Sequence, residues 1–392
     1  MANNELPDWR QYMATLGDAD QVLALLADPN DPFARQEAHR LLFLSLASGF
    51  LSTFVDLDAP DFVPLVNNHF NSVGANPDFI YAYTQIDGAG SYRLSGFRGD
   101  GLFLLFDFAA GGLGVTDILG PSVGVLDADT LTIAADGSFE VLLSTELPAG
   151  HEGDWFMLDP RASTINVRQA AYDWGAGNEA RLAIERIDRT SAHHRPDAAE
   201  TARRLALLAD YPRRYGSFAL GYDKGQRERD LVNKLEHDDW AERGGLVGQH
   251  YYQGIFQLQP GEAMIIETAL PERVRYWNIQ LNDRLWNSID WFNHQSSLNG
   301  GQAVLDEDGL FRAVISVEDP GVPNWLDPAG RSEGSLMLRW TEASSGPEPA
   351  LRVVPLVELR RQLPTSTPVI TAEMRDKALR ERRRSAQLRR RW

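Results

Sequence analysis

The chain has 392 residues, of which 43% are hydrophobic and 24% charged, and it contains no cysteine. This length allows one large or two ordinary domains, and the composition excludes a mostly disordered chain. The formal net charge of −17 makes nucleic acid a poor partner, and the lack of cysteine excludes disulfides, thiolate catalysis and cysteine-ligated metals.

Residues 1–73 are predicted to form an N-terminal helical region, because their apolar residues recur at helical spacing. Asp31 is expected to cap a helix whose first residue is Pro32 and which runs to about Val55. Its most apolar stretch is too short to span a bilayer, and the start of the chain lacks the pattern of a signal peptide. We therefore expect no membrane span and a cytoplasmic location.

Residues 74–192 form a predicted β-rich domain, in which short runs of Tyr, Phe, Ile and Leu alternate with turns such as Asp136-Gly137. Residues 193–244 return to helical spacing and high charge. They are interpreted as a helical insertion or linker with two helices, the first from about Asp197 to Asp210.

Residues 245–370 are predicted to form a second β domain, and residues 371–392 a basic C-terminal helix that begins near Thr371. From Glu373 onward the chain has a net charge of +6, which leaves −23 on the rest. Such a run is usually a solvated helix end, so the chain after Leu379 is expected to be dispensable for folding. The predicted fold class is mainly β, with one or two jelly-roll-like antiparallel sandwiches and N-terminal, mid-chain and C-terminal helices.

The segment with the most candidate chemistry runs from Tyr276 to Asp327. Strand alternation places Tyr276, Asn278 and Gln280 on one face. The polar stretch that follows is rich in aromatic residues, a combination that suits sugars, polyols or other polyfunctional molecules. The predicted substrate-binding residues are Tyr252, Arg284, Trp286, Asn287, Trp291 and Asn299. The alternative is a long structural loop pinned by hydrogen bonds from side chains to the backbone.

Acid/base chemistry is assigned to His294, Asp290 and Glu318, because carboxylates beside an imidazole raise its pKa toward neutrality. The alternative is a loop histidine beside a strand that ends in a turn. Arg312, Arg331 and Arg339 alternate with apolar residues. An inward arginine would clamp a carboxylate or sulfate, but an outward surface position is expected for each.

The motifs of this region resemble the C-terminal signature of the domain of unknown function 1214 family. The resemblance covers about residues 245–345 and rests on QHYYQGIFQLQPGEAMIIE, RYWNIQLNDRLWNSIDW, HQSSLN, LDEDGLFRAVISVEDPGVPNWLD and RSEGSLMLRW. It implies a fold related to the jelly-roll sandwich and carries no catalytic role. Residues 1–73 fall outside it and have no predicted role.

Two functions follow as hypotheses. The first is a metal-independent enzyme of catabolic or secondary metabolism that acts by acid/base chemistry on a polyfunctional small molecule or glycoside. The alternative is a non-catalytic protein that binds a small molecule or a carbohydrate. No cofactor and no metal are expected, since the chain has no H-x-H pair of the cupin type. A homo-oligomer is left open.

Overall fold

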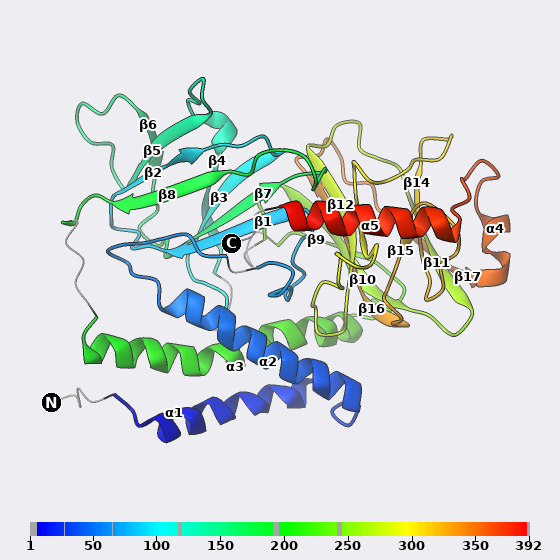
Figure 1. Ribbon diagram of the computed structural model, residues 1–392, viewed down its shortest axis with the longest axis horizontal. Helices are drawn as coiled ribbons and strands as arrows, with labels where there is room; N and C mark the ends of the chain where they lie inside the picture. Colours follow the sequence, from blue (N-terminus) through cyan, green and yellow to red (C-terminus); the bar gives the residue numbers. More distant parts are fainter. Residues whose placement is uncertain are drawn as a thin grey trace.

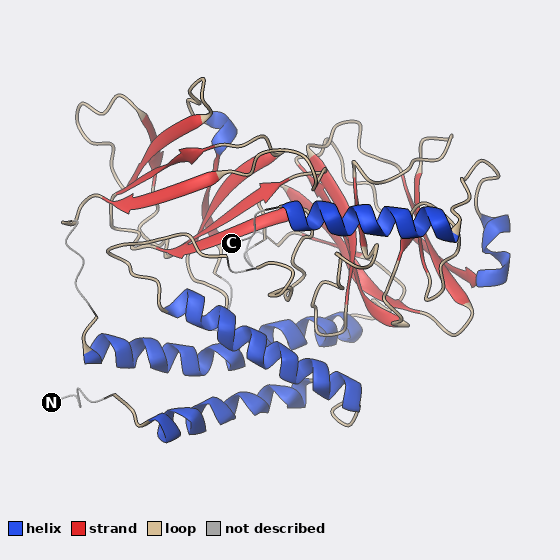
Figure 2. Ribbon diagram, viewed as in Figure 1, coloured by secondary structure: helices blue, strands red, loops and turns tan. Residues whose placement is uncertain are grey.

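The computed structural model describes residues 6–26, 28–64, 66–116, 120–190, 196–240 and 245–389. Two β sandwiches lie side by side, with a layer of helices beneath them and a long C-terminal helix that lies across the C-terminal sandwich (Figures 1 and 2). The prediction of a mainly β fold with N-terminal, mid-chain and C-terminal helices is confirmed.

The N-terminal sandwich contains two four-stranded sheets, with strand orders β1-β7-β3-β4 and β6-β5-β2-β8. All pairs are antiparallel except β5 with β6. Alternate residues of the facing strands, such as Leu104 and Phe106 of β3 and Val141 of β5, fill the core between the sheets, as strand geometry requires. The strands are β1 Phe79–Gln85, β2 Tyr92–Phe97, β3 Phe103–Ala109, β4 Ser122–Asp127, β5 Ser138–Ser144, β6 Asp154–Met157, β7 Thr164–Ala170 and β8 Arg181–Arg186.

The C-terminal sandwich pairs a five-stranded sheet, β13-β12-β16-β10-β9, with a four-stranded sheet, β15-β14-β11-β17. Trp277 and Ile279 of β12 point into its core, so the alternation predicted for this strand is confirmed. The short β9 lies inside the segment that was predicted to be a helical linker. The strands are β9 Glu236–Asp238, β10 Gln249–Gln257, β11 Glu262–Thr268, β12 Tyr276–Asn282, β13 Ser297–Asn299, β14 Phe311–Ile315, β15 Trp325–Leu326, β16 Glu333–Thr341 and β17 Ala350–Pro355.

The two sandwiches meet through the outer faces of sheets β1-β7-β3-β4 and β13-β12-β16-β10-β9. We call the space between these faces the seam. Phe79, Phe103 and Ala170 of the first sheet form one apolar cluster with Tyr276 of the second. Because both faces of β3 and β12 are covered, these two strands are buried along their whole length.

The helical layer consists of α1 (Trp9–Leu16), the 3-10 helix η1 (Gly17–Leu25), α2 (Pro32–Thr53) and α3 (Ala198–Glu228). Asp31 caps α2 through the Phe33 N–H, as predicted. None of the helices in the described part of the chain is long and apolar enough to cross a bilayer.

The prediction of two mid-chain helices is wrong, because α3 continues without a break past Pro212. Proline removes one helical hydrogen bond and is unfavourable in a helix interior. The neighbouring Tyr211 and Tyr215 are fully buried against Leu41 and Leu44 of α2. Burial of these two large rings offsets the local cost of the proline.

The C-terminal helix α5 (Ala372–Leu388) begins at Thr371, which accepts from the Met374 N–H as predicted. The expectation of a solvated tail is wrong for one of its faces. Ala386 packs against Trp174 and Trp291, and the Arg382 guanidinium lies 4.4 Å from the centre of the Trp174 ring. Short α4 (Leu359–Gln362) precedes it. Residues 390–392 lie outside the described part.

Candidate functional site

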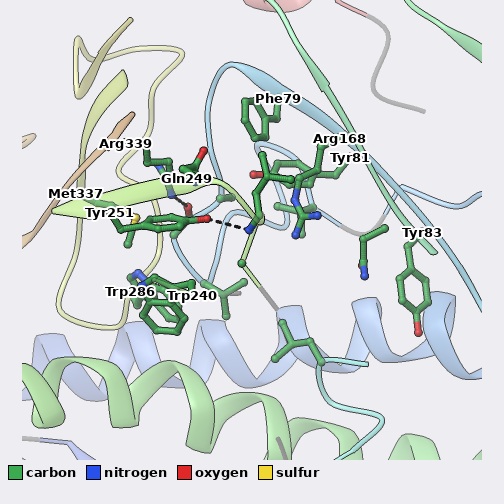
Figure 3. A pocket seen from close by; sticks show the side chains of 18 of the residues that line it. Phe79, Tyr81, Tyr83, Arg168, Trp240, Gln249, Tyr251, Trp286, Met337 and Arg339 are labelled. Carbon is green, nitrogen blue, oxygen red and sulfur yellow. Dashed lines mark hydrogen bonds between the residues drawn. The ribbon is translucent and has the colours of Figure 1, made fainter. Parts of the chain in front are cut away.

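A cavity of about 160 Å³ lies in the seam. Figure 3 shows its walls, which come from β1 and β7 of one sandwich and from β10 and β16 of the other. Seven aromatic rings line it: Phe79, Tyr81, Tyr83, Phe218, Trp240, Tyr251 and Trp286. Its polar side chains are Asn166, Arg168, Gln249 and Arg339.

The same cross-strand pair, a tyrosine opposite an arginine, occurs on both walls of the cavity. Tyr81 of β1 lies opposite Arg168 of β7, and Tyr251 of β10 lies opposite Arg339 of β16. Side chains along a strand alternate between its two faces, and the next residues along each of these four strands face the sandwich cores. All four side chains therefore point to the seam. Each sandwich therefore contributes one such tyrosine and arginine pair, and β1 adds a further phenol, Tyr83.

The two arginines differ in how their charges are balanced. Arg168 Nη1 lies 2.6 Å from Oδ2 of Asp107, a carboxylate that is almost fully buried. Arg339 is only 6% exposed, and the expectation that it faces outward is wrong. Its guanidinium donates to Gln280 Oε1 at 2.6 Å and to the Gly74 carbonyl at 2.9 Å, and neither acceptor is charged.

Two of the phenols in the cavity, Tyr81 and Tyr251, each accept a backbone hydrogen bond. Tyr81 Oη accepts from the Asn76 N–H at 3.0 Å, and Tyr251 Oη accepts from the Leu246 N–H at 3.2 Å. Burial raises the pKa of Tyr81, while the nearby charge of Arg339 acts in the opposite direction. The net upward shift keeps the Tyr81 phenol protonated at neutral pH.

Trp286 lines the cavity and stacks on Tyr222 at 4.0 Å between ring centres. Its φ angle of 57° is left-handed, and Val73 and Gly74 beside it also have positive φ. A Cβ on Gly74 would lie 2.7 Å from Trp286 Nε1, so only glycine fits there. Non-glycine residues in this conformation cost free energy and cluster at functional sites.

The predicted catalytic residues do not line this cavity. His294 Nδ1 lies 2.7 Å from Asp327 Oδ2, and Asp290 accepts from the backbone N–H groups of Phe292 and Asn293. The Glu318 side chain is exposed at the end of β14. Their joint catalytic role stays a prediction, but the structure does not bring them into the seam.

Among the predicted substrate-binding residues, only Trp286 lines the cavity. Tyr252 faces the core of its own sandwich and donates to the Gly346 carbonyl at 2.5 Å. Arg284 forms an ion pair with Glu333 at 2.8 Å. The other three have structural partners: Asn287 donates to Asp283, Trp291 packs under α5, and Asn299 donates to Asp78.

Asp78 is the centre of a buried polar network beside the cavity. It is 1% exposed and accepts from Tyr276 Oη at 2.6 Å, Asn299 Nδ2 at 2.6 Å and Trp174 Nε1 at 2.8 Å. Burial raises its pKa against the lowering effect of these donors. The network ties β1 and β12, and hence the two sandwiches, together.

Sequence reasoning missed Tyr81, Asn166 and Arg168. One signal was available: FIYAYTQ places tyrosines at two alternate positions, 81 and 83, and TINVRQA places Asn166 and Arg168 at alternate positions of a mostly buried strand. Such a strand has two buried faces, and its polar side chains need partners or a cavity. In the described part of the chain, no group of three or more His, Asp or Glu side chains is arranged to hold a metal ion.

The pair of His294 and Asp327 makes a testable contribution to stability. The hydrogen bond to Asp327 raises the pKa of His294 above its ordinary value. A pKa that is higher in the folded state means that the folded protein binds the proton more tightly than the unfolded chain. This stabilisation is complete below the unfolded pKa of about 6.5, and it is lost as pH rises through the folded pKa. We expect His294→Gln to destabilise most below about pH 6 and less at higher pH, as measured by urea unfolding.

The control for this prediction is Asp327→Asn, which removes the carboxylate and should remove most of the pH dependence. The His294 side chain is 37% exposed, so solvent screening keeps the effect small. A destabilisation by His294→Gln that grows with pH would contradict the assignment.

In the comparisons with known proteins, the chain matches solved structures but no family model and no curated protein. An uncharacterised protein from Burkholderia cenocepacia is similar, with 29% identity and a TM-score of 0.81 over 89% of this chain and 97% of that one. A protein from Vibrio parahaemolyticus matches with 12% identity and a TM-score of 0.45 over 81% and 99%. Neither is described by an activity.

Proposed function

We propose that this protein binds a small organic molecule in the cavity of the seam, without catalysis. Ligand sites are common between domains and combine aromatic walls with a few placed polar groups. Both features are found here. The volume of about 160 Å³ is close to the roughly 150 Å³ of a protein cavity that holds benzene. A molecule with one ring is therefore the right size.

The observation that carries this proposal is the indole N–H of Trp286. The side chain is 5% exposed and lines the cavity, yet Nε1 has no hydrogen-bond partner among the described residues. A buried donor without an acceptor costs about 1–3 kcal/mol. A ligand atom that accepts this hydrogen bond would offset the cost. Ligand binding would also account for the left-handed backbone conformation of Trp286.

A second candidate is an acid/base enzyme acting through His294. The observation in its favour is the 2.7 Å contact with Asp327, which orients the imidazole and raises its pKa. Since the pair lies outside the seam and His294 belongs to a loop, we favour binding over catalysis. Conversion of a bound ligand to a product that stops in His294→Ala would reverse this preference.

A family relationship is also part of this proposal. We propose that residues 245–345 belong to the domain of unknown function 1214 family, on the motifs that form β10, β12 and β16. Structure determination of a member of that family would test it. The relationship predicts a five-stranded sheet in the same order, with tyrosine and arginine at the places of Tyr251 and Arg339.

Fragment screening by thermal shift tests the binding function. We expect at least one single-ring compound to raise the melting temperature of the wild type, and Trp286→Phe to weaken its binding about fivefold or more through loss of the N–H. Phenylalanine keeps a ring on Tyr222. The matched control is Trp155→Phe, since Trp155 donates to Ser144 and does not line the cavity. Equal binding to wild type and Trp286→Phe, or no binding at all, would refute the proposal.

A further inference from the structure

Most hydrogen-bonding groups that the described cavity walls leave without a protein partner can donate, and the unpartnered Tyr83 hydroxyl can donate as well as accept. The oxygens of Tyr81 and Tyr251 already accept a backbone N–H, so each hydroxyl proton is left to donate. Trp286 adds a third donor. Gln249 uses its carbonyl oxygen to accept from Thr341, which leaves its amide N–H groups. A ligand that matches these walls must therefore present acceptors.

Arg339 adds a charge to this set of donors. A guanidinium has five N–H groups, and three hydrogen bonds are made, to Asn278, Gln280 and Gly74. These leave the N–H of Nε and one N–H of Nη2 without an acceptor among the described residues. No carboxylate of the described chain lies within ion-pair distance of Arg339, whereas Arg168 is balanced by Asp107. The cavity thus carries one uncompensated positive charge.

We propose that the ligand is a small organic monocarboxylate of about one ring in size, held by Arg339. This inference rests on the proposed binding function and specifies its ligand class. A single negative charge matches the single unbalanced guanidinium, whose planar N–H groups fit the two oxygens of a carboxylate. The hydroxyls of Tyr81 and Tyr251 donate to the same anion. The rings of Trp240 and Trp286 cover the apolar part of the ligand.

Two other ligand classes fit less well. A sugar carries hydroxyl groups that need acceptors as well as donors, and the described cavity side chains offer few acceptors: the Asn166 carbonyl oxygen and the unpartnered Tyr83 hydroxyl. A phosphate monoester is a dianion at neutral pH and would need a second unbalanced cation. Arg168 cannot supply it without breaking its contact with Asp107.

The test is a binding series in which only the charged group changes. Calorimetry on the full chain would compare benzoate, substituted benzoates and branched short-chain carboxylates with their amides and with phenyl phosphate. We expect at least one carboxylate to bind, its amide to bind at least about tenfold more weakly, and phenyl phosphate to bind more weakly than benzoate. Equal binding of a carboxylate and its amide, or preference for phenyl phosphate, would overturn the inference.

The outcomes separate this inference from the proposed function. If a neutral fragment binds in a manner that depends on Trp286 while no carboxylate binds, the ligand class is wrong and the binding function stands. If nothing binds, both fail.

Variants of Arg339 give the second arm of the test. Arg339→Met should abolish the preference for carboxylate over amide, while Arg339→Lys should keep part of it. Arg339→Met removes the three hydrogen bonds of the guanidinium as well as its charge, so the melting temperature of the empty variant is measured first to show that it folds. Should Arg339→Met fail to fold, Tyr251→Phe removes one donor and is expected to weaken carboxylate binding several-fold. A full carboxylate preference in the folded Arg339→Met protein, or in Tyr251→Phe where that variant replaces it, would refute the assignment.

Discussion

Removal of the chain after Leu379 is expected to lower the melting temperature by on the order of 10 °C. The truncation deletes Arg382, which donates to the Trp291 carbonyl at 2.5 Å and to Ser297 Oγ at 2.7 Å. It also deletes Arg389, which pairs with Glu179 at 3.1 Å. Buried hydrogen bonds of charged groups contribute about 1.5–3 kcal/mol each, and 1 kcal/mol shifts the melting temperature of a large domain by about 2–4 °C. Differential scanning calorimetry would measure the shift.

Single substitutions on the same helix provide the control. Arg380 is exposed, and its ion pair within the described part of the chain is with Asp376 one turn earlier, so Arg380→Ala should cost less than about 0.5 kcal/mol. Arg382→Ala should cost several times more. If the truncated chain melts within about 2 °C of the full chain, α5 does not stabilise the fold.

The start of α5 could be predicted from the sequence, but its docking on the sandwiches could not. Its start at Thr371 follows from local capping chemistry, as does the start of α2 at Asp31 and Pro32, and both were predictable. Its docking was not. Charged residues dominate the segment, and only three-dimensional contact with the carbonyls and carboxylates of both sandwiches gives Arg382 and Arg389 their buried partners.

The cavity illustrates the same division. Alternation in β12 and β16 identifies which residues face away from the sandwich core, and thus assigns Gln280 and Arg339 to the opposite face. Whether that face meets water or a second sandwich depends on a contact with β1 and β7, far away in the sequence. Long-range packing of this kind leaves no periodicity in a single strand.

The polar loop after β12 makes the hydrogen bonds expected of the structural alternative, and its role as a site stays a prediction. Asp283 and Asp290 both accept backbone N–H groups within their own turns. Asn299 binds the Tyr172 carbonyl as well as Asp78. These are the side-chain to backbone bonds of the structural alternative. Polar density alone therefore does not distinguish a ligand site from a loop that must satisfy its own backbone.

Replacement of Asp78 by alanine is expected to cost on the order of 4 kcal/mol of unfolding free energy. The substitution leaves the N–H of Trp174 and one N–H of Asn299 buried without their acceptor, and each such loss costs about 1–3 kcal/mol. It also leaves a small cavity, which adds to the cost. Because the network joins β1 to β12, the loss loosens the contact between the two sandwiches. Urea unfolding at pH 7 would measure it.

Asp78→Asn should cost distinctly less, about 1–2 kcal/mol. An amide oxygen can still accept from Trp174 and Asn299, and the Tyr276 hydroxyl can turn to Asn76 Oδ1, which lies 3.0 Å away. The matched control is Asp173→Ala, an exposed aspartate whose hydrogen bonds with the described residues come from backbone N–H groups of its own turn. If Asp78→Ala destabilises the protein no more than Asp173→Ala does, the network is not what holds the seam together, because its central acceptor would then be dispensable.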